Sequence, residues 1–167
     1  TLFRFLTDKF GETALVVYEG EQPPKYDKPL VSVCSPEIDE TTMSDDGRQQ
    51  DELVNAILVR IPKNIKNPVV AALNVAGYIR GILPFESFSD YLEPDHDCVN
   101  LPEHIKGQAL VFGSSDKENK TNYQGYEITF IQIARYGTEA KAAFNLTAID
   151  LKETHGAPVR VYEQQDT

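Results

Sequence analysis

One short segment of the 167-residue chain concentrates side chains that can bind a metal or move a proton. Two of the three histidines and one of the two cysteines lie between positions 93 and 104, among several carboxylates. Imidazole and carboxylate are common ligands of zinc and related metals, and a carboxylate beside a histidine can orient it as a general base. The residues of this candidate metal site are Asp95, His96, Asp97, Glu103 and His104.

The spacing within this segment argues against a dedicated site. His96 and His104 do not have the H-E-x-x-H spacing, and nothing in the pattern places them on one helix. Our main interpretation is therefore a solvated acidic loop. A metal-dependent enzyme or cation-binding protein that uses this cluster is the alternative, and a divalent metal is the only cofactor that the sequence suggests.

A second acidic cluster lies earlier in the chain, and the whole chain has a net charge of −10. Phosphate backbones are bound by clustered Lys and Arg, so this charge argues against direct binding to nucleic acid. Only Arg48 balances the carboxylates of the second cluster. Acidic surfaces of this kind commonly keep a protein soluble. The functional interpretation is a binding surface formed by Glu37, Asp39, Glu40, Asp45, Asp46, Asp51 and Glu52.

No motif for nucleophilic catalysis accompanies these clusters. The segment 113–116 (Gly-Ser-Ser-Asp) lacks the G-x-S-x-G pattern of a nucleophile elbow, and no glycine-rich phosphate loop is present. We therefore expect a non-catalytic binding or assembly module that acts through acidic loops, as a structural subunit would. Its partner is expected to be a basic protein surface or further copies of the chain. The remaining alternative is an acidic inhibitor that mimics nucleic acid or blocks a basic protein surface.

The two cysteines and the ends of the chain bear on its compartment. Cys34 and Cys98 have no C-x-x-C spacing, so they are interpreted either as one long-range disulfide or as two buried thiols. Triplets of the N-x-T type begin at Asn119 and Asn145, which leaves extracellular and cytoplasmic locations equally compatible. The chain begins with Thr1, as expected of a processed protein or a fragment. No apolar run is judged long enough to insert into a membrane, and a soluble domain is expected.

The elements that would position these residues differ along the chain. Strands are predicted at 2–6, 13–19 and 30–34 from β-forming residues separated by turn signals. Between 53 and 61 apolar residues recur at helical spacing, which predicts a helix. A second helix is expected to follow Asn67-Pro68 and to run to 83, apolar on most sides and so buried, and a pair of buried strands is the alternative for this segment. A short amphipathic turn is expected at 84–92.

The last third of the chain has the clearest strand pattern. Strands are predicted at 109–112, 126–136, 142–151 and 159–162, with a bulge near Ile131 and a meander formed by the last three. The expected fold class is α+β in one domain: an antiparallel sheet from both ends of the chain (1–36 and 109–163), and a mostly helical, acidic insertion at 45–92. An all-β sandwich is the alternative.

Overall fold

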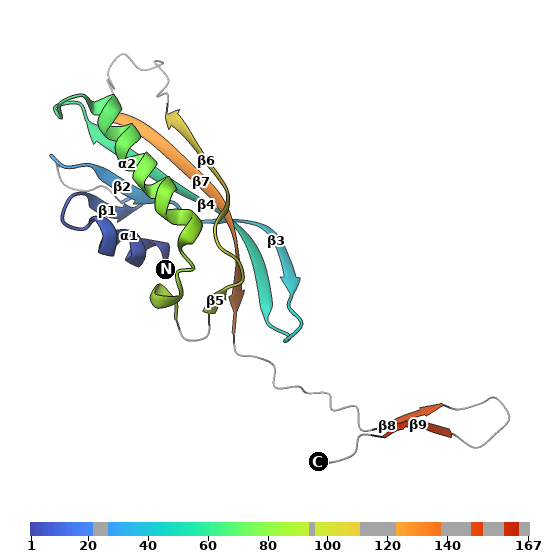
Figure 1. The fold of residues 1–167 in the computed structure, drawn as a ribbon. Helices are drawn as coiled ribbons and strands as arrows, with labels where there is room; N and C mark the ends of the chain where they lie inside the picture. The colour runs from blue at the N-terminus through green and yellow to red at the C-terminus, as the bar shows by residue number, and fades with distance from the viewer. Residues whose placement is uncertain (22–26, 94–95, 111–122, 138–147, 152–158, 164–167) are drawn as a thin grey trace.

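A computed structural model of the chain describes residues 1–21, 27–93, 96–110, 123–137, 148–151 and 159–163. These residues form a mixed structure of a curled, mostly antiparallel sheet and two α-helices (Figure 1). The expected α+β class with an antiparallel sheet is confirmed at this level. The arrangement of the elements differs from the expectation in several places.

The sheet is built around two long strands, β4 (Gln49–Pro62) and β7 (Tyr123–Tyr136). They pair antiparallel without a register shift, from Gln49 opposite Tyr136 to Pro62 opposite Tyr123. The other edge of β4 pairs with β2 (Leu30–Val33) and then β3 (Glu37–Met43), and the other edge of β7 pairs with β5 (His96–Cys98) and then β6 (Glu103–Leu110). Strand β1 (Leu15–Tyr18) pairs in parallel with β2.

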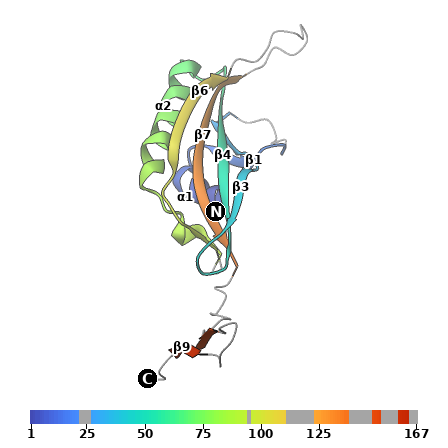
Figure 2. The same ribbon diagram turned by 90° about the vertical axis from the view of Figure 1, so that its right-hand side faces the viewer.

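Both helices, α1 (Leu2–Phe10) and α2 (Pro68–Ile82), lie on the same side of the sheet (Figure 2). The rings of Phe10 in α1 and Tyr78 in α2 meet edge to face with centroids 5.5 Å apart. Two short 3₁₀ turns, η1 (Leu83–Phe85) and η2 (Ser89–Tyr91), follow α2. The buried side chains of the helices pack on alternate residues of the long strands, namely Ile57, Val59, Ile61, Ile128 and Phe130.

The strand expected at 2–6 is wrong, because this segment is the first half of α1. Phe5, Leu6 and Phe10 are buried, and this spacing places them on one face of a helix. Five residues with alternating Phe are too few to separate a period of two from one of 3.6. The strands expected at 13–19 and 30–34 are confirmed as β1 and β2.

The helix expected at 53–61 is also wrong, and with it the mostly helical middle at 45–92, because this segment belongs to β4. One face of β4 lies in the core, and residues of its other face, such as Leu58, are half-buried. A strand that is covered on both faces loses the simple alternation of apolar and polar residues. The spacing of its apolar residues then also fits the period of a helix.

The second expected helix is confirmed as α2, which begins after Asn67 with Pro68 at its first turn. Its expected burial is wrong, because the helix buries only the face formed by Ala72, Ala76 and Ile79. The opposite face exposes Val69, Val70, Leu73 and Tyr78. By length and composition alone, residues 68–85 would be apolar enough to cross a membrane, although the helix packs on the sheet by one side.

The C-terminal meander is wrong as well. Strand β7 pairs with β4, β5 and β6, whereas β8 (Ala148–Leu151) and β9 (Val159–Glu163) form a separate two-stranded sheet. The irregularity expected near Ile131 is not in β7 along β4, but in the neighbouring strand β6 between Glu103 and Lys106. The expected strand segments 111–112 and 142–147 lie outside the described residues.

The packing of α1 on η2 predicts a large difference between two phenylalanines. The ring of Phe5 is fully buried and meets Phe88 and Tyr91 edge to face, whereas Phe85 is 83% exposed. We expect Phe5→Ala to lower the free energy of unfolding by about 3–5 kcal/mol, because it leaves a cavity in the core. The matched control Phe85→Ala should change it by less than about 0.5 kcal/mol. Urea unfolding followed by circular dichroism measures both, and equal losses would contradict the packing described here.

Candidate functional site

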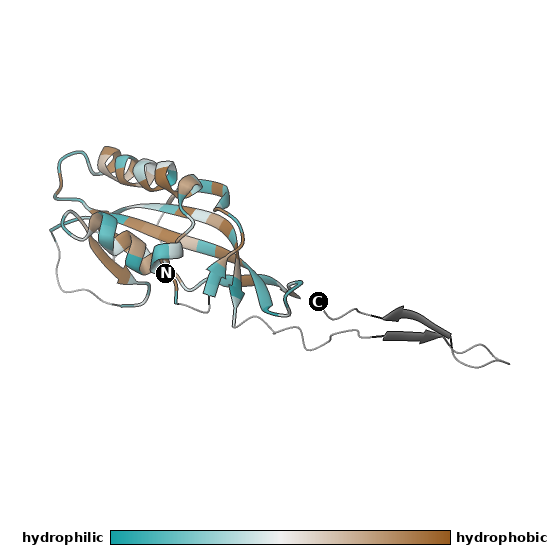
Figure 3. Ribbon diagram, turned by 60° about the horizontal axis from the view of Figure 1, so that its bottom comes forward, coloured by the Kyte–Doolittle hydropathy of each residue, from teal (hydrophilic) through white to brown (hydrophobic). Residues whose placement is uncertain are grey.

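The hairpin of β3 and β4 carries the second acidic cluster at one end of the sheet. Every residue of β3 is exposed, and within the described chain β3 pairs only with β4, so its outer edge has no strand beside it. Figure 3 shows this end of the hairpin largely in the hydrophilic colour. The cluster therefore lies on a free sheet edge rather than in the expected loops around a helix.

Asp51 of this cluster has a structural position. Its side chain is 3% exposed and lies opposite Thr41 in the neighbouring strand. The Thr41 hydroxyl donates a hydrogen bond of 2.8 Å to Asp51 Oδ1, and Gln49 Nε2 lies 3.1 Å from both carboxylate oxygens. Because these donors satisfy the buried carboxylate, Asp51 holds β3 to β4 and is not available to a partner.

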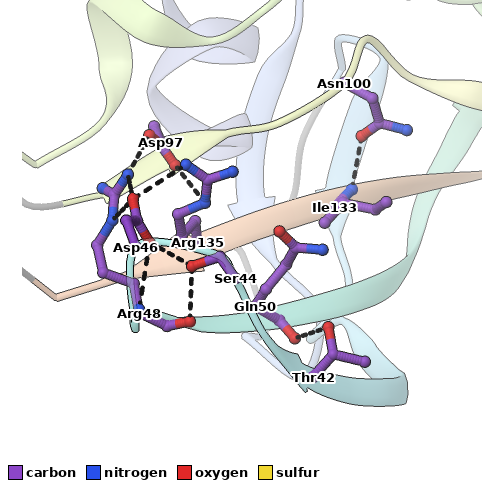
Figure 4. A network of polar contacts seen from close by, with 9 residues as sticks. All are labelled: Thr42, Ser44, Asp46, Arg48, Gln50, Asp97, Asn100, Ile133 and Arg135. Carbon is purple, nitrogen blue, oxygen red and sulfur yellow. Dashed lines mark hydrogen bonds and ion pairs between the residues drawn. The ribbon is translucent and has the colours of Figure 1, made fainter. Parts of the chain in front are cut away.

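Asp46 is likewise engaged inside the protein, in an ionic network (Figure 4). Arg48 Nη2 lies 2.6 Å from Asp46 Oδ2 and 3.2 Å from Asp97 Oδ2. Arg135 Nη1 lies 3.3 Å from Asp46 Oδ2, and Arg135 Nε lies 3.9 Å from Asp97 Oδ1. Two carboxylates and two guanidinium groups thus neutralise one another. This clamp (Asp46, Arg48, Asp97 and Arg135) joins the β3–β4 turn to β5 and β7.

The clamp changes the titration of its central carboxylate. Hydrogen bonds from the side chains of Arg48 and Ser44 hold the pKa of Asp46 well below its usual range. A carboxylate whose folded-state pKa is depressed stabilises the fold above its unfolded pKa, near 4, and this contribution is lost as the pH falls toward the folded pKa. The turn of the hairpin is therefore most firmly held at neutral pH.

Four members of the acidic cluster remain unpaired. Glu37, Asp39, Glu40 and Asp45 are exposed, and none of them forms an ion pair or side-chain hydrogen bond with any described residue. The last member, Glu52, is half-buried opposite Glu40. The seven acidic residues expected to form one surface are thus divided between internal contacts and a set of free carboxylates on and beside β3.

The candidate metal residues do not converge among the described residues. Asp97 is held by the clamp, the ring of His96 meets Tyr136 edge to face at 5.2 Å, and Glu103 accepts a hydrogen bond of 3.1 Å from Asn100. His104 is exposed with a positive φ of 52°. Asp95 lies outside the described residues. No group of three or more His, Cys, Asp or Glu side chains in the described part of the chain could hold a metal ion, so the metal site stays a prediction without a geometry.

The two cysteines are free thiols, one just after β2 and the other at the end of β5. Burial, together with the nearby charge of Asp97, raises the pKa of Cys98 to about 11, and burial also raises the pKa of Cys34. Both thiols are therefore protonated at neutral pH. A protonated thiol is a poor nucleophile and a poor metal ligand.

Both thiols also line a cavity of about 390 Å³ beside the first turn of α1, which the sequence interpretation did not anticipate. Its walls come from α1, the sheet and the segment around η2, and include Phe3, Tyr18, Phe88 and Phe130. In the sequence, the side of the sheet that lines the cavity is indicated only by the alternating apolar residues of β7. That alternation does not show that α2 leaves part of this side of the sheet uncovered.

Neither models of protein families nor curated protein sequences match this chain. Three local features of the described residues bear on its function: the free acidic edge of β3, the clamp and the cavity.

The lowered pKa of Asp46 predicts an acid-dependent loss of stability. We expect wild-type protein to lose thermal stability between pH 6 and pH 3, and Asp46→Asn to be less stable than wild type at pH 6 but to lose less on acidification. The measurement is the melting temperature by circular dichroism at each pH. Asp45→Asn is the matched control, because the exposed neighbouring carboxylate has no ion pair with a described residue. An acid response in Asp46→Asn as steep as that of wild type would contradict the role of the clamp.

Proposed function

We propose that this chain is a non-catalytic protein-binding module that binds a basic, extended segment of another protein along the free edge of β3. The observation that carries the proposal is that every residue of β3 is exposed at a sheet edge where no described strand pairs and three carboxylates have no partner among the described residues. An edge strand presents backbone N–H and C=O groups that an added strand can pair with. The proposal retains the binding role expected from the sequence and assigns it to the edge of β3.

The charge of β3 selects the kind of partner. Glu37, Asp39 and Glu40 lie within four residues, around an irregularity in the pairing between Ile38 and Glu40. Two copies of this edge side by side would bring like charges together, which destabilises cross-strand pairing. Charges and bulges on edge strands commonly prevent such self-pairing. A partner strand with Lys or Arg instead relieves the repulsion, so we favour a basic segment over a second copy of the chain at this edge.

The other interpretations from the sequence have less support. A metal-dependent enzyme would need ligands that converge, and the described residues supply no such group. An inhibitor that covers a basic protein surface would use the same carboxylates as the proposed module. The two differ in one respect, because a blocking surface needs only charge, whereas an added strand also needs backbone hydrogen bonds.

A synthetic peptide of alternating Lys and Val tests the proposal. We expect the peptide to bind at low salt, to protect amides of residues 37–43 from hydrogen exchange, and to bind more weakly as salt is added. A second peptide with alternate N-methylated backbone amides keeps the charge but cannot pair as a strand. We expect it to bind much more weakly, and equal binding of both peptides would favour the charge-only inhibitor.

Charge variants locate the binding surface. The triple variant Glu37→Gln, Asp39→Asn, Glu40→Gln should weaken peptide binding about tenfold at low salt, because three exposed charge pairs contribute roughly 0.2–1 kcal/mol each. The matched control neutralises three exposed acidic residues elsewhere, Glu12, Asp27 and Asp90, and changes the net charge by the same amount. Isothermal titration calorimetry measures both variants. Equal weakening in the two would mean that only net charge matters and would overturn the proposal.

A further inference from the structure

The cavity beside α1 has a size and lining suited to a small molecule. Its volume of about 390 Å³ falls within the range of roughly 300–1,000 Å³ that is common for ligand pockets. Aromatic rings from four segments of the chain form much of its wall, namely Phe3, Tyr18, Phe88 and Phe130. This site is separate from the free edge of β3 and does not depend on the proposed function.

The cavity follows from a mismatch of lengths. The fourteen residues of β4 span about 45 Å, whereas the fifteen residues of α2 span about 22 Å. Helix α2 therefore covers only part of the inner face of the two long strands, and none of its residues lines the cavity. The same inner face continues past the helix through Leu53, Asn55 and Gln132.

One amide in the cavity wall has an oxygen without a hydrogen-bond partner among the described residues. The side chain of Gln132 is 5% exposed, and its Nε2 donates a hydrogen bond of 3.1 Å to the Asn100 carbonyl. This bond fixes the orientation of the amide, because the reverse orientation would place two carbonyl-type oxygens together. Gln132 Oε1 accepts no hydrogen bond from any residue that the structure describes. The oxygen is not fully enclosed, so it can accept a hydrogen bond from water or from a ligand that enters the cavity.

The other polar groups of the cavity restrict the charge of the occupant. The Tyr136 side chain lines the cavity, and its hydroxyl makes no hydrogen bond to a described residue. Burial and the nearby carboxylate of Asp51 raise the pKa of Tyr136, so its hydroxyl stays neutral. Asp97 also borders the cavity, but its carboxylate is held in the clamp by Arg48 and Arg135 on the other face of the sheet. No Lys or Arg side chain of the described residues lines the cavity, so a neutral ligand suits it better than an anionic one such as a fatty acid.

We propose that this cavity binds a small, neutral, mainly apolar molecule that donates a hydrogen bond to Gln132. The apolar walls supply most of the favourable free energy by removing the ligand from water. The hydrogen bond to the amide oxygen sets the orientation of the ligand and selects for molecules with an N–H or O–H group.

A fluorescent probe tests the proposal on the intact chain. N-phenyl-1-naphthylamine is neutral and apolar and has one N–H group, and its N-methyl derivative has the same rings without that donor. We expect wild-type protein to bind both probes saturably. Gln132→Leu should weaken binding of the N–H probe about three- to tenfold, as expected for one lost hydrogen bond, and leave the N-methyl probe nearly unchanged. An equal effect on both probes would overturn the role of Gln132.

Two further variants separate the cavity from other apolar surfaces. Ala134→Phe should abolish binding of both probes, because Ala134 lines the cavity and is buried. Leu73→Ser, on the exposed apolar face of α2, should leave binding unchanged. The opposite pattern would show that the probes bind to α2 and would overturn the proposal.

A measurement on wild-type protein is independent of how well the variants fold. Cys34 and Cys98 are the only cysteines of the chain and both line the cavity. Saturating N-phenyl-1-naphthylamine should slow the reaction of both thiols with N-ethylmaleimide, read by intact-protein mass spectrometry. Unchanged labelling rates, or the absence of saturable probe binding, would overturn the proposal.

Discussion

The antiparallel pairing of β4 with β7 is the constraint on which the rest of the structure depends. It runs through fourteen consecutive residue pairs without a register shift, and every other strand of the main sheet joins one of its two edges directly or through β2. A shift of one residue in the register of either strand would move the buried side chains of that strand to the opposite face of the sheet. The buried set that includes Ile57, Val59 and Ile128 therefore fixes which side the helices cover, and also which side chains reach the far end of the strands.

The two ends of this ladder are stabilised differently. Near the α2 end, apolar packing holds the sheet, because the helix buries Ala72, Ala76 and Ile79 against it. Near the hairpin end, β3 buries none of its side chains, and polar contacts replace packing. Asp51 bonds to Thr41 across the pair of strands, and the clamp joins the turn to β5 and β7. The strongly acidic hairpin keeps its position because two of its carboxylates are satisfied internally.

The sequence predicted those elements whose signals are local. Asn67-Pro68 marks the start of α2, and the alternation after Tyr126 marks β7, so both were expected in the right place. The signals failed where burial from two sides removes the alternation, as in β4, and where a segment is short, as in α1. The β-branched residues of β4 favour a strand, but the spacing of Leu53, Ile57 and Ile61 matched a helix equally well.

The candidate sites depended on contacts that no local pattern contains. The contact between Arg135 and Asp46 spans 89 positions in the sequence, so the sequence could place Asp46 in an acidic cluster but could not show that it is already paired. The cavity is lined by residues of α1, the sheet and the segment around η2. The alternation in β7 is a pattern within one of these segments, so it could not show that the segments meet around a cavity. Composition predicted an acidic surface; the topology decided which carboxylates remain free.

The two proposed binding surfaces differ in how far their side chains are ordered before a partner binds. In the cavity, the Asn100 carbonyl fixes the amide of Gln132, and the Asn100 side chain in turn accepts a hydrogen bond of 2.7 Å from the backbone N–H of Ile133. A ligand there meets a polar group whose rotamer is already ordered, so less conformational entropy is lost on binding. At β3 the backbone edge is equally fixed, but the exposed carboxylates lose rotamer freedom and an extended partner must become ordered. For an equal gain in contacts, the cavity therefore favours tight binding of a small molecule, whereas the edge of β3 favours reversible, salt-sensitive binding of a chain.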